Sequence, residues 1–286
     1  MPGDGSAPDV DADPRPPRPE SLLLAFCGAH LLDHDRCVAV GSVIELLARL
    51  DVSEPATRAA LNRMTKRGLF HSVRQGRHVY LRLTTQAETI LRDGGVRLES
   101  ETVRREWDGT WTLLAFSVPE SRRAERHTLR THLGWAGFGL LQNGLWISPS
   151  PLDISPTLAE LGLLNYVKIF RVEATSTDPR SIAAEAWDLT SLADGYAAFL
   201  RRWTDGGPEH HDELCRQVLL ETEWLLLIRE DPRLPLELLP EGWPGVRSEE
   251  VFWSLRRQLD RPARRLADAS LSWMPLEDRS RTATPR

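Results

Sequence analysis

Seven Arg or Lys residues and no carboxylate occupy the stretch from Ala56 to Thr84, which makes it the part of the sequence best suited to bind a polyanion. The whole chain has a formal net charge of -5, so the residues outside the stretch sum to -12 once its +7 is removed. A phosphate backbone responds to the local field rather than to the net charge of a protein. The stretch is therefore typical of a nucleic-acid-binding surface.

The side chains of this stretch suit different contacts with a duplex. Asn62 and Arg63 suit base edges, because amide–adenine and guanidinium–guanine pairs are bidentate. Lys66, Arg67 and the arginines near Gly76 suit phosphates, which position a protein without choosing sequence. Our candidates for DNA contact are Thr57, Arg58, Asn62, Arg63, Lys66, Arg67, Arg74, Arg77 and His78. The alternative is a solvated helix face without a partner.

Metal binding is a second hypothesis, for residues near the N-terminus. Cys27, His30, His34 and Cys37 have spacings that a zinc site could use, since thiolates and imidazoles are common zinc ligands. A core thiol and solvated imidazoles would account for the same residues. We expect no metal and no cofactor, although the sequence leaves zinc at these four positions open.

A metal-dependent nuclease of the ferredoxin-like class would need a carboxylate at the end of the first strand in the middle of the chain, to hold a divalent ion. Here that end is Ala115–Pro119, which contains no Asp, and the single Glu120 follows a proline. Neither a Ser-His-Asp pattern, a phosphate-binding loop nor a dinucleotide fingerprint is visible. We therefore predict no catalytic residues and no enzyme activity, with a metal-dependent nuclease as the alternative.

Capping signals and apolar spacing indicate the elements that would carry the basic residues. Ser21 is a candidate N-cap for a first helix, and Arg36–Val40 is a short β-branched strand. Ser42, with a glutamate three residues later, has the spacing of a capping box for a second helix. Ser53 is predicted to cap a third helix, and Gly68 to end it in left-handed backbone.

Beyond Gly68 the sequence changes from helical to strand periodicity. Two β-prone segments flank Gly76, which suits a tight hairpin turn. Helix, short strand, two helices and a hairpin is the order of a winged helix-turn-helix. The third helix would enter the major groove, and the hairpin tip would reach phosphates or the minor groove.

The middle of the chain predicts a different fold. Trp111–Val118 is expected as a buried strand, Glu120–Trp135 as an amphipathic helix with Leu129 and Leu133 inward, and Gly137–Pro149 as a hairpin turning at an Asn-Gly pair. Another helix and the strand YVKIFRVEA follow. The order β-α-β-β-α-β is that of a ferredoxin-like fold.

The chain beyond Asp178 is predicted to be helical. Candidate helices are Trp187–Trp203, Glu209–Glu230 and Glu249–Ser270. The predicted fold class is thus α+β multidomain, with an N-terminal winged helix-turn-helix, a ferredoxin-like βαββαβ middle and a helical C-terminal domain. The predicted segments are a disordered leader (1–20), the winged helix-turn-helix (21–86), a helical connector (87–106), the ferredoxin-like domain (107–178), the helical domain (179–276) and a disordered tail (277–286).

Composition gives no sign of a membrane or an oxidising compartment. The chain contains no apolar run approaching the roughly 18 residues that span a bilayer. The first 20 residues lack the apolar core of a secretory signal, and three unevenly spaced cysteines do not make a disulfide framework. We expect a cytoplasmic protein without a membrane partner.

Several segments, in one order from Ser21 to Trp273, resemble the PaaX-like repressors of phenylacetic-acid degradation. They are SLLLAFCG, TRAALNRMTKRGLF, GRHVYLRLT, WDGTWTLLAFSVPE, LRTHLGWAGFG, GLWISP and DPRLPLELLPEGWPG. The resemblance implies a winged helix, a middle domain similar to CRISPR-associated ferredoxin-like nucleases, and a helical C-terminal domain. It also implies a homodimer that releases its operator when an aryl-CoA thioester binds.

The residues and the resemblance together predict a ligand-responsive transcriptional regulator, a repressor of an aromatic-acid catabolic operon. The expected partners are double-stranded DNA with an inverted-repeat operator, a small-molecule effector and a second copy of the chain. Arg130 and Trp135 are our candidates for the effector site, because a pocket for an aromatic acyl-CoA needs both cations and aromatic rings. A winged helix that binds protein instead of DNA remains an alternative.

Overall fold

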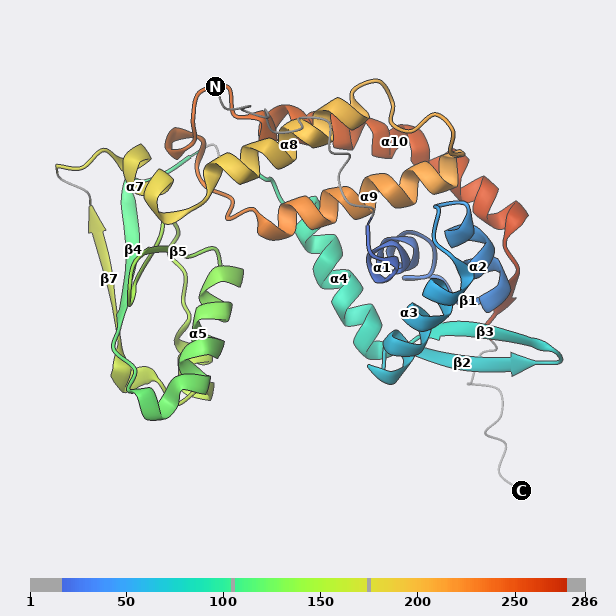
Figure 1. The fold of residues 1–286 in the computed structure, drawn as a ribbon, viewed down its shortest axis with the longest axis horizontal. Coiled ribbons are helices and arrows are strands. Elements are labelled where there is room, and N and C mark those ends of the chain that lie inside the picture. Colours follow the sequence, from blue (N-terminus) through green and yellow to red (C-terminus); the bar gives the residue numbers. More distant parts are fainter. Residues whose placement is uncertain (1–16, 104–105, 174–175, 277–286) are drawn as a thin grey trace, which may run out of the picture.

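The molecule has two ends joined by long helices. The computed structural model describes residues 17–103, 106–173 and 176–276. Figure 1 shows N-terminal helices and a β-hairpin at one end, a second sheet at the other, and long C-terminal helices between them. Residues 1–16 of the predicted leader and the whole predicted tail (277–286) lie outside the described residues.

The N-terminal region contains α1 (Pro19–His30), β1 (Arg36–Ala39), α2 (Val40–Ala48), α3 (Glu54–Lys66), β2 (Phe70–Gln75) and β3 (His78–Leu83). This is the predicted order, but two helix starts differ. Helix α1 begins at Pro19, two residues before the expected cap Ser21, because proline has the backbone angle that a first turn requires. Helix α2 begins at Val40, so Ser42 lies inside it, where its hydroxyl accepts the N–H of Ser272 at 2.9 Å.

Strands from both ends of the chain form the N-terminal sheet. Strands β2 and β3 pair antiparallel over six residue pairs, and Gly76 at their turn has φ 59°, as the sequence predicts. Strand β1 pairs with β3 on one side and with β8 (Trp273–Pro275) on the other, which gives the order β2-β3-β1-β8. The prediction that the chain is helical throughout its C-terminal part is therefore wrong at β8.

Helix α4 (Thr85–Glu99) leads from the N-terminal region to the middle region. That region contains β4 (Thr110–Phe116), α5 (Arg123–Trp135), β5 (Gly139–Gln142), β6 (Leu145–Ser148), α6 (Ser155–Glu160) and β7 (Val167–Glu173), with 3-10 turns at Glu120–Arg122 and Leu164–Tyr166. Its antiparallel sheet has the order β5-β6-β4-β7, and Leu129 and Leu133 of α5 are buried against it. Element order and sheet order are those of a ferredoxin-like fold.

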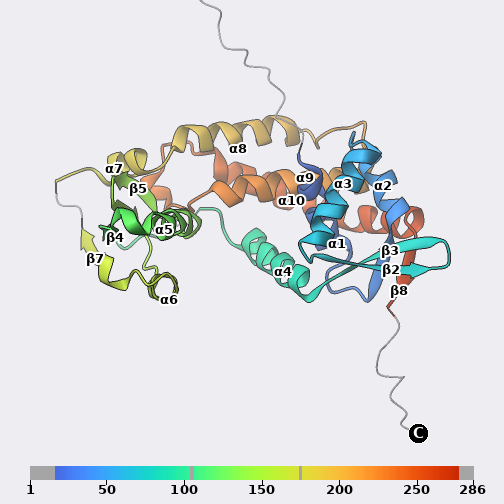
Figure 2. The ribbon, with the colours of Figure 1, turned by 60° about the horizontal axis from the view of Figure 1, so that its bottom comes forward.

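The C-terminal region contains α7 (Pro179–Ala186), α8 (Leu189–Trp203), α9 (Glu213–Glu230) and α10 (Pro244–Ser270), with a 3-10 turn at Leu236–Leu238. The expected helix start at Trp187 is wrong: this residue ends α7, and Asp188 caps α8 by accepting the N–H of Ser191. Similarly, Asp212 caps α9. Figure 2 shows α8 lying along α9 and α10.

Two hydrophobic cores hold these elements. The first is shared by the N-terminal and C-terminal regions, where it includes Phe26 of α1, Trp224 of α9 and Phe252 of α10, and it also reaches Trp111 of β4. The second lies within the middle region, around Leu114 and Leu129. Helix α1 packs directly on α9, where Nε2 of His30 lies 3.0 Å from Oε1 of Gln217. The orientation of α1 is therefore tied to the C-terminal helices.

Candidate functional site

The basic side chains of α3 lie on its outer face because its opposite face is buried. Ala60, Leu61 and Met64 pack into the first core, whereas Asn62 and Lys66 are exposed. Both predicted helix ends are confirmed: the Ser53 hydroxyl accepts the N–H of Ala56 at 3.4 Å, and Gly68 has φ 75°. The exposed members of the predicted set on α3 and the residue after it are Arg58, Asn62, Arg63, Lys66 and Arg67.

Thr57 is an exception among the residues expected to contact DNA. Its side chain has an exposed fraction of 0%, and its hydroxyl donates to the carbonyl of Ser53 at 3.2 Å. At about 3.6 residues per turn it falls on the same face as Ala60 and Met64. The expectation of a DNA contact through the Thr57 side chain is therefore corrected: this side chain belongs to the core.

Two of the arginines on α3 have carboxylate partners. Nε of Arg58 lies 2.8 Å from Glu54, one turn away, and Nε of Arg63 lies 2.7 Å from Glu20 of α1. Burial acts to raise the pKa of Glu20, but its hydrogen bonds to Arg63 and to the backbone, together with the charges of Arg63 and Arg18, hold the pKa below its ordinary value. Exposed pairs of this kind contribute about 0–1 kcal/mol, so a phosphate can replace the carboxylate.

The remaining cations of the predicted set have no carboxylate partner among the residues that the structure describes. Lys66, Arg67, Arg74 and Arg77 are exposed, and within the described ranges they make no ion pair. The outer surface of α3 and the hairpin therefore keeps a concentration of positive charge that is available to a polyanion. We call these four residues the free cations.

The register of the hairpin separates residues that the sequence grouped together. His71 pairs with Arg82, and Gln75 with His78, on one face, whereas Arg74 pairs with Val79 on the other, and Arg77 lies in the turn. Arg82 and His71 are exposed but were not among our candidates. The alternation of Arg82 with the buried Leu81 and Leu83 was the signal that could have identified it.

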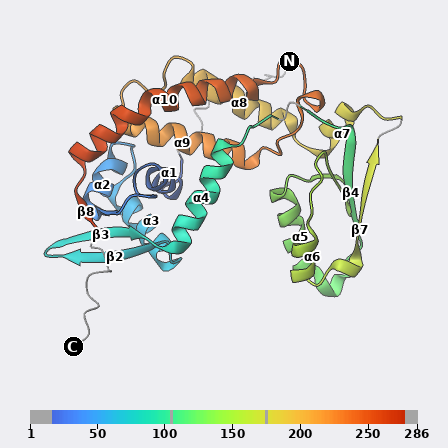
Figure 3. The same ribbon diagram turned by 180° about the vertical axis from the view of Figure 1, so that it is seen from behind.

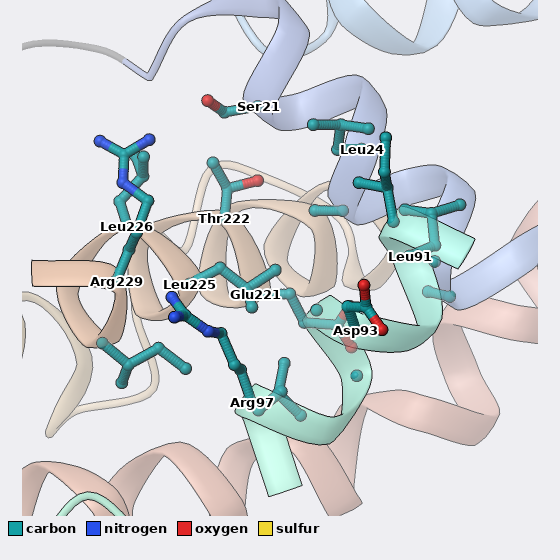
Figure 4. A pocket seen from close by; sticks show the side chains of 18 of the residues that line it. Ser21, Leu24, Leu91, Asp93, Arg97, Glu221, Thr222, Leu225, Leu226 and Arg229 are labelled. Atoms are coloured by element: carbon teal, nitrogen blue, oxygen red, sulfur yellow. The ribbon is translucent and has the colours of Figure 1, made fainter. Parts of the chain in front are cut away.

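A cavity of about 390 Å³ lies behind this surface, between α1, α4 and α9. Its walls are mainly apolar and include Leu24 and Ala25 of α1, Leu91 of α4 and Leu225 of α9. Figure 4 shows these helices around the cavity, with the guanidinium group of Arg97 extending from α4 toward α9. The cavity is therefore in contact with both the N-terminal and the C-terminal regions.

One buried carboxyl group lines this cavity. Glu221 of α9 has an exposed fraction of 5%, and its Oε1 lies 3.3 Å from Nε of Arg256 on α10. Burial raises the pKa of Glu221 to about 7, although Arg256 opposes this shift. The group can therefore act as a hydrogen-bond donor or as an acceptor near neutral pH.

The two residues predicted for an effector site are both exposed on α5. Trp135 has an exposed fraction of 68%, and neither Trp135 nor Arg130 lines the cavity. Trp135 is nevertheless close to it, because its carbonyl oxygen lies 3.4 Å from a guanidinium nitrogen of Arg97, which does line the cavity. Nothing in the structure connects Arg130 to this site.

The suggested zinc ligands do not form a common site. Cys27 and Cys37 are free and buried, and burial raises the pKa of the Cys27 thiol to about 12, which disfavours the thiolate. Burial also lowers the pKa of His30 to about 4, and its Nε2 is engaged by Gln217. In the described parts of the chain, one group of side chains is close enough together to hold a metal ion: Asp51, His210 and His211. Their potential ligand atoms lie within 4.8 Å of one another.

The carboxylate considered for a metal site follows the end of β4. Glu120, the carboxylate nearest to this end, lies 2.6 Å from a guanidinium nitrogen of Arg126 and is largely exposed. It is not among the grouped metal-ligand side chains of the described residues. Among the described helices, none is both long and apolar enough to cross a bilayer.

These features define an α+β protein in which a basic helix and hairpin share a core with C-terminal helices, and a ferredoxin-like sheet lies at the other end of the molecule. Three family models match it: PaaX-like protein at residues 18–87, PaaX protein central Cas2-like domain at 104–183, and PaaX-like protein C-terminal domain at 187–269. The chain belongs to the PaaX-like family.

Two known proteins illustrate the similarity. The transcriptional repressor PaaX of Escherichia coli (strain K12) is 30% identical over 252 residues, which cover 81% of this chain and 77% of the repressor. The uncharacterized protein Rv0674 from Mycobacterium tuberculosis is similar in structure, with a TM-score of 0.61 and 23% identity. That match covers 89% of this chain and 98% of Rv0674. The second similarity supports the fold alone.

Proposed function

We propose that the protein is a DNA-binding transcriptional repressor in which α1–α3 and the β2–β3 hairpin form a winged helix-turn-helix. The observation that carries the proposal is the exposed outer surface of α3 and the hairpin, where the free cations have no carboxylate partner among the described residues. Membership of the PaaX-like family, with a transcriptional repressor as a relative, supports it. Membership of this family also favours a transcriptional regulator over an enzyme.

In this proposal α3 enters the major groove of DNA. Asn62 and Arg63 face base edges, and Lys66 and Arg67, near the C-terminal end of the helix, contact phosphates. The hairpin acts as the wing, with Arg77 at its turn and Arg74 and His78 beside it. Arg58 and Arg63 exchange their carboxylate partners for DNA on binding.

The proposed regulatory cycle uses two copies of the chain. A homodimer in the cytoplasm would hold two winged helices at the spacing of an inverted-repeat operator. An aryl-CoA thioester would favour another geometry of the dimer, and the operator of an aromatic-acid catabolic operon would then be released. Family membership supports this cycle, and light scattering of the free and DNA-bound protein measures the number of copies.

Titration of labelled DNA from upstream of the protein's own gene tests DNA binding. We expect affinity to fall steeply with salt, and Lys66→Ala and Arg67→Ala each to lower the log–log salt slope by about 0.9, because each removes one phosphate contact. Arg201→Ala, which removes an exposed cation of α8, is the matched control and should bind as the wild type does. Unchanged affinity and slope in both α3 variants would contradict the proposal.

A further inference from the structure

The cavity between α1, α4 and α9 exists because small residues line helices that otherwise carry large apolar side chains. Ala25, Gly28 and Ala29 line it from α1, and Gly94 and Gly95 line it from α4. A Cβ atom added at Gly94 or Gly95 would meet no atom within 4 Å. The space is therefore left open by the choice of residues and is not a defect in an otherwise close-packed core.

The chemistry of the walls selects the kind of molecule that fits. Leu24, Leu91 and Leu225 offer an apolar surface to a compact apolar body, and a volume of about 390 Å³ is in the usual range for small-molecule sites. Arg97 lines the same space, and its described partner is a backbone carbonyl rather than a carboxylate. By contrast, the guanidinium of Arg256 is paired with Glu221. Asp93 and Glu99 also line the cavity with exposed carboxylates, and Arg229 lies 3.7 Å from Glu230. An anionic group would therefore meet its charge partner at Arg97.

We propose that this cavity is the regulatory site of the protein and that it binds a compact hydrophobic anion, with the apolar body between α1 and α9 and the charge at Arg97. The effect of the ligand on DNA rests on the proposed function above, whereas ligand binding itself does not. An apolar acid and an acyl thioester both offer this combination, and the experiment separates them.

The position of α4 explains how a ligand in this cavity would reach the DNA-binding surface. Figure 3 shows α4 running from β3, beside α1, toward the middle sheet. Two adjacent glycines weaken α4, since glycine is about 1 kcal/mol less favourable than alanine in a helix interior. A ligand packed on Gly94 and Gly95 would fix α4 against α1 and α9. Because α4 joins β3 to the middle region, the ligand would set how the DNA-binding region is held.

Filling the cavity tests the site. Gly94→Leu places a side chain in the open space and replaces glycine by a better helix former, so its unfolding temperature should not fall. Gly41→Leu is the matched control, because Gly41 is also helical and open but lies outside the cavity. The probes are naphthalene-2-carboxylate, its neutral carboxamide and its coenzyme A thioester, each titrated into the full chain by calorimetry.

We expect the carboxylate or the thioester to bind to the wild type, and to bind to Gly41→Leu with the same affinity. Gly94→Leu should bind this ligand at least tenfold more weakly. If the carboxylate binds, Arg97→Gln should remove the difference in affinity between the carboxylate and the neutral carboxamide. If only the thioester binds, the ligand class is acyl thioesters. Wild-type affinity in folded Gly94→Leu, or no binding of any probe to wild type, overturns the site. DNA titrations in the presence of ligand then test whether ligand binding changes DNA affinity. A ligand that binds without changing DNA affinity overturns the regulatory role. Failure of the Lys66 and Arg67 variants to weaken DNA binding overturns only the proposed function.

Discussion

The free cations and the paired arginines of α3 differ in what they must give up to contact DNA. Lys66 and Arg67 can meet a phosphate directly, whereas Arg63 must first leave Glu20. The pair is partly exposed, so its separation costs little in water. In the proposed complex with DNA, Glu20 would therefore lower the affinity without preventing binding. Because Glu20 lies at the start of α1, far from Arg63 in the sequence, this effect would require the folded protein.

Glu20→Gln should raise DNA affinity by about two- to fivefold at low salt, because Arg63 no longer has a competing carboxylate. The difference should shrink as salt is added, since the Debye length falls to about 10 Å at 0.1 M. Anisotropy titrations at two salt concentrations measure it, with Glu185→Gln on α7 as the control for a change of net charge. An equal rise in both variants would show that Arg63 is not involved.

Glu221 gives the protein a pH dependence of stability with a defined sign. Its pKa in the folded protein is about 7 because of burial, above the ordinary 4.5. The stability that comes from holding this proton is present below about pH 4.5 and is lost as pH rises to about 7. Relative to wild type, Glu221→Gln should therefore gain stability between pH 5 and pH 8, by at most about 3 kcal/mol.

Urea unfolding of both proteins at each pH measures this change in the free energy of unfolding. Glu213→Gln, an exposed carboxylate on the same helix, is the control and should show a difference from wild type that does not vary over this range. A difference between Glu221→Gln and wild type that stays constant from pH 5 to pH 8 would contradict the buried, protonated carboxyl.

At the scale of elements, β8 joins the C-terminal part of the chain to the sheet of the N-terminal region. Trp273 lies under the Arg36 guanidinium, 3.7 Å from the ring centroid, and stacks on Phe26 with the ring centroids 6.3 Å apart. Its indole N–H also donates to the carbonyl of Ala267 at 3.0 Å. The short strand is therefore held by side-chain packing in addition to its pairing with β1.

Trp273→Ala should lower the free energy of unfolding by about 2 kcal/mol, less than the loss of a fully buried tryptophan because its ring is only partly buried. Trp135→Ala removes the same side chain from an exposed site and should change stability by less than about 0.5 kcal/mol. Urea denaturation of the two variants measures both effects. Equal losses would mean that β8 adds nothing to the N-terminal sheet.

At the scale of the whole molecule, the core shared by the two ends of the chain makes them one cooperative unit. Phe252 of α10 stacks on Trp224 of α9 in this core, whereas Leu129 belongs to the core of the middle region. Both Phe252 and Leu129 have an exposed fraction of 0%, so their truncation should cost about 3–5 kcal/mol in each case.

Phe252→Ala should speed hydrogen exchange in α1 and α3 as well as in α9 and α10, because one opening exposes all four helices. Leu129→Ala should speed exchange in α5 and the middle sheet only. Exchange measured by mass spectrometry in low urea distinguishes the two patterns. Protection of α1 that is unaffected by Phe252→Ala would contradict a shared core.

Signals within a few residues predicted much of the fold and of the candidate site. The Ser53 cap, the left-handed Gly68 and Gly76, and the inward Leu129 are confirmed because each depends on local backbone geometry. The start of α2 was wrong because Ser42 bonds to Ser272, far along the chain. Thr57 was grouped with its basic neighbours, although its place on the helix already set it among the core residues.

The amino-acid sequence by itself determined the order of most helices and strands, the ends of α3 and its outward basic side chains, because these follow from capping and periodicity within a segment. Only the tertiary structure decided that β8 completes the N-terminal sheet, that Glu20 pairs with Arg63, and that α1, α4 and α9 enclose a cavity. Those features depend on contacts between residues that lie from 43 to more than 180 positions apart in the sequence. The pattern of residues within one segment carries no information about such contacts.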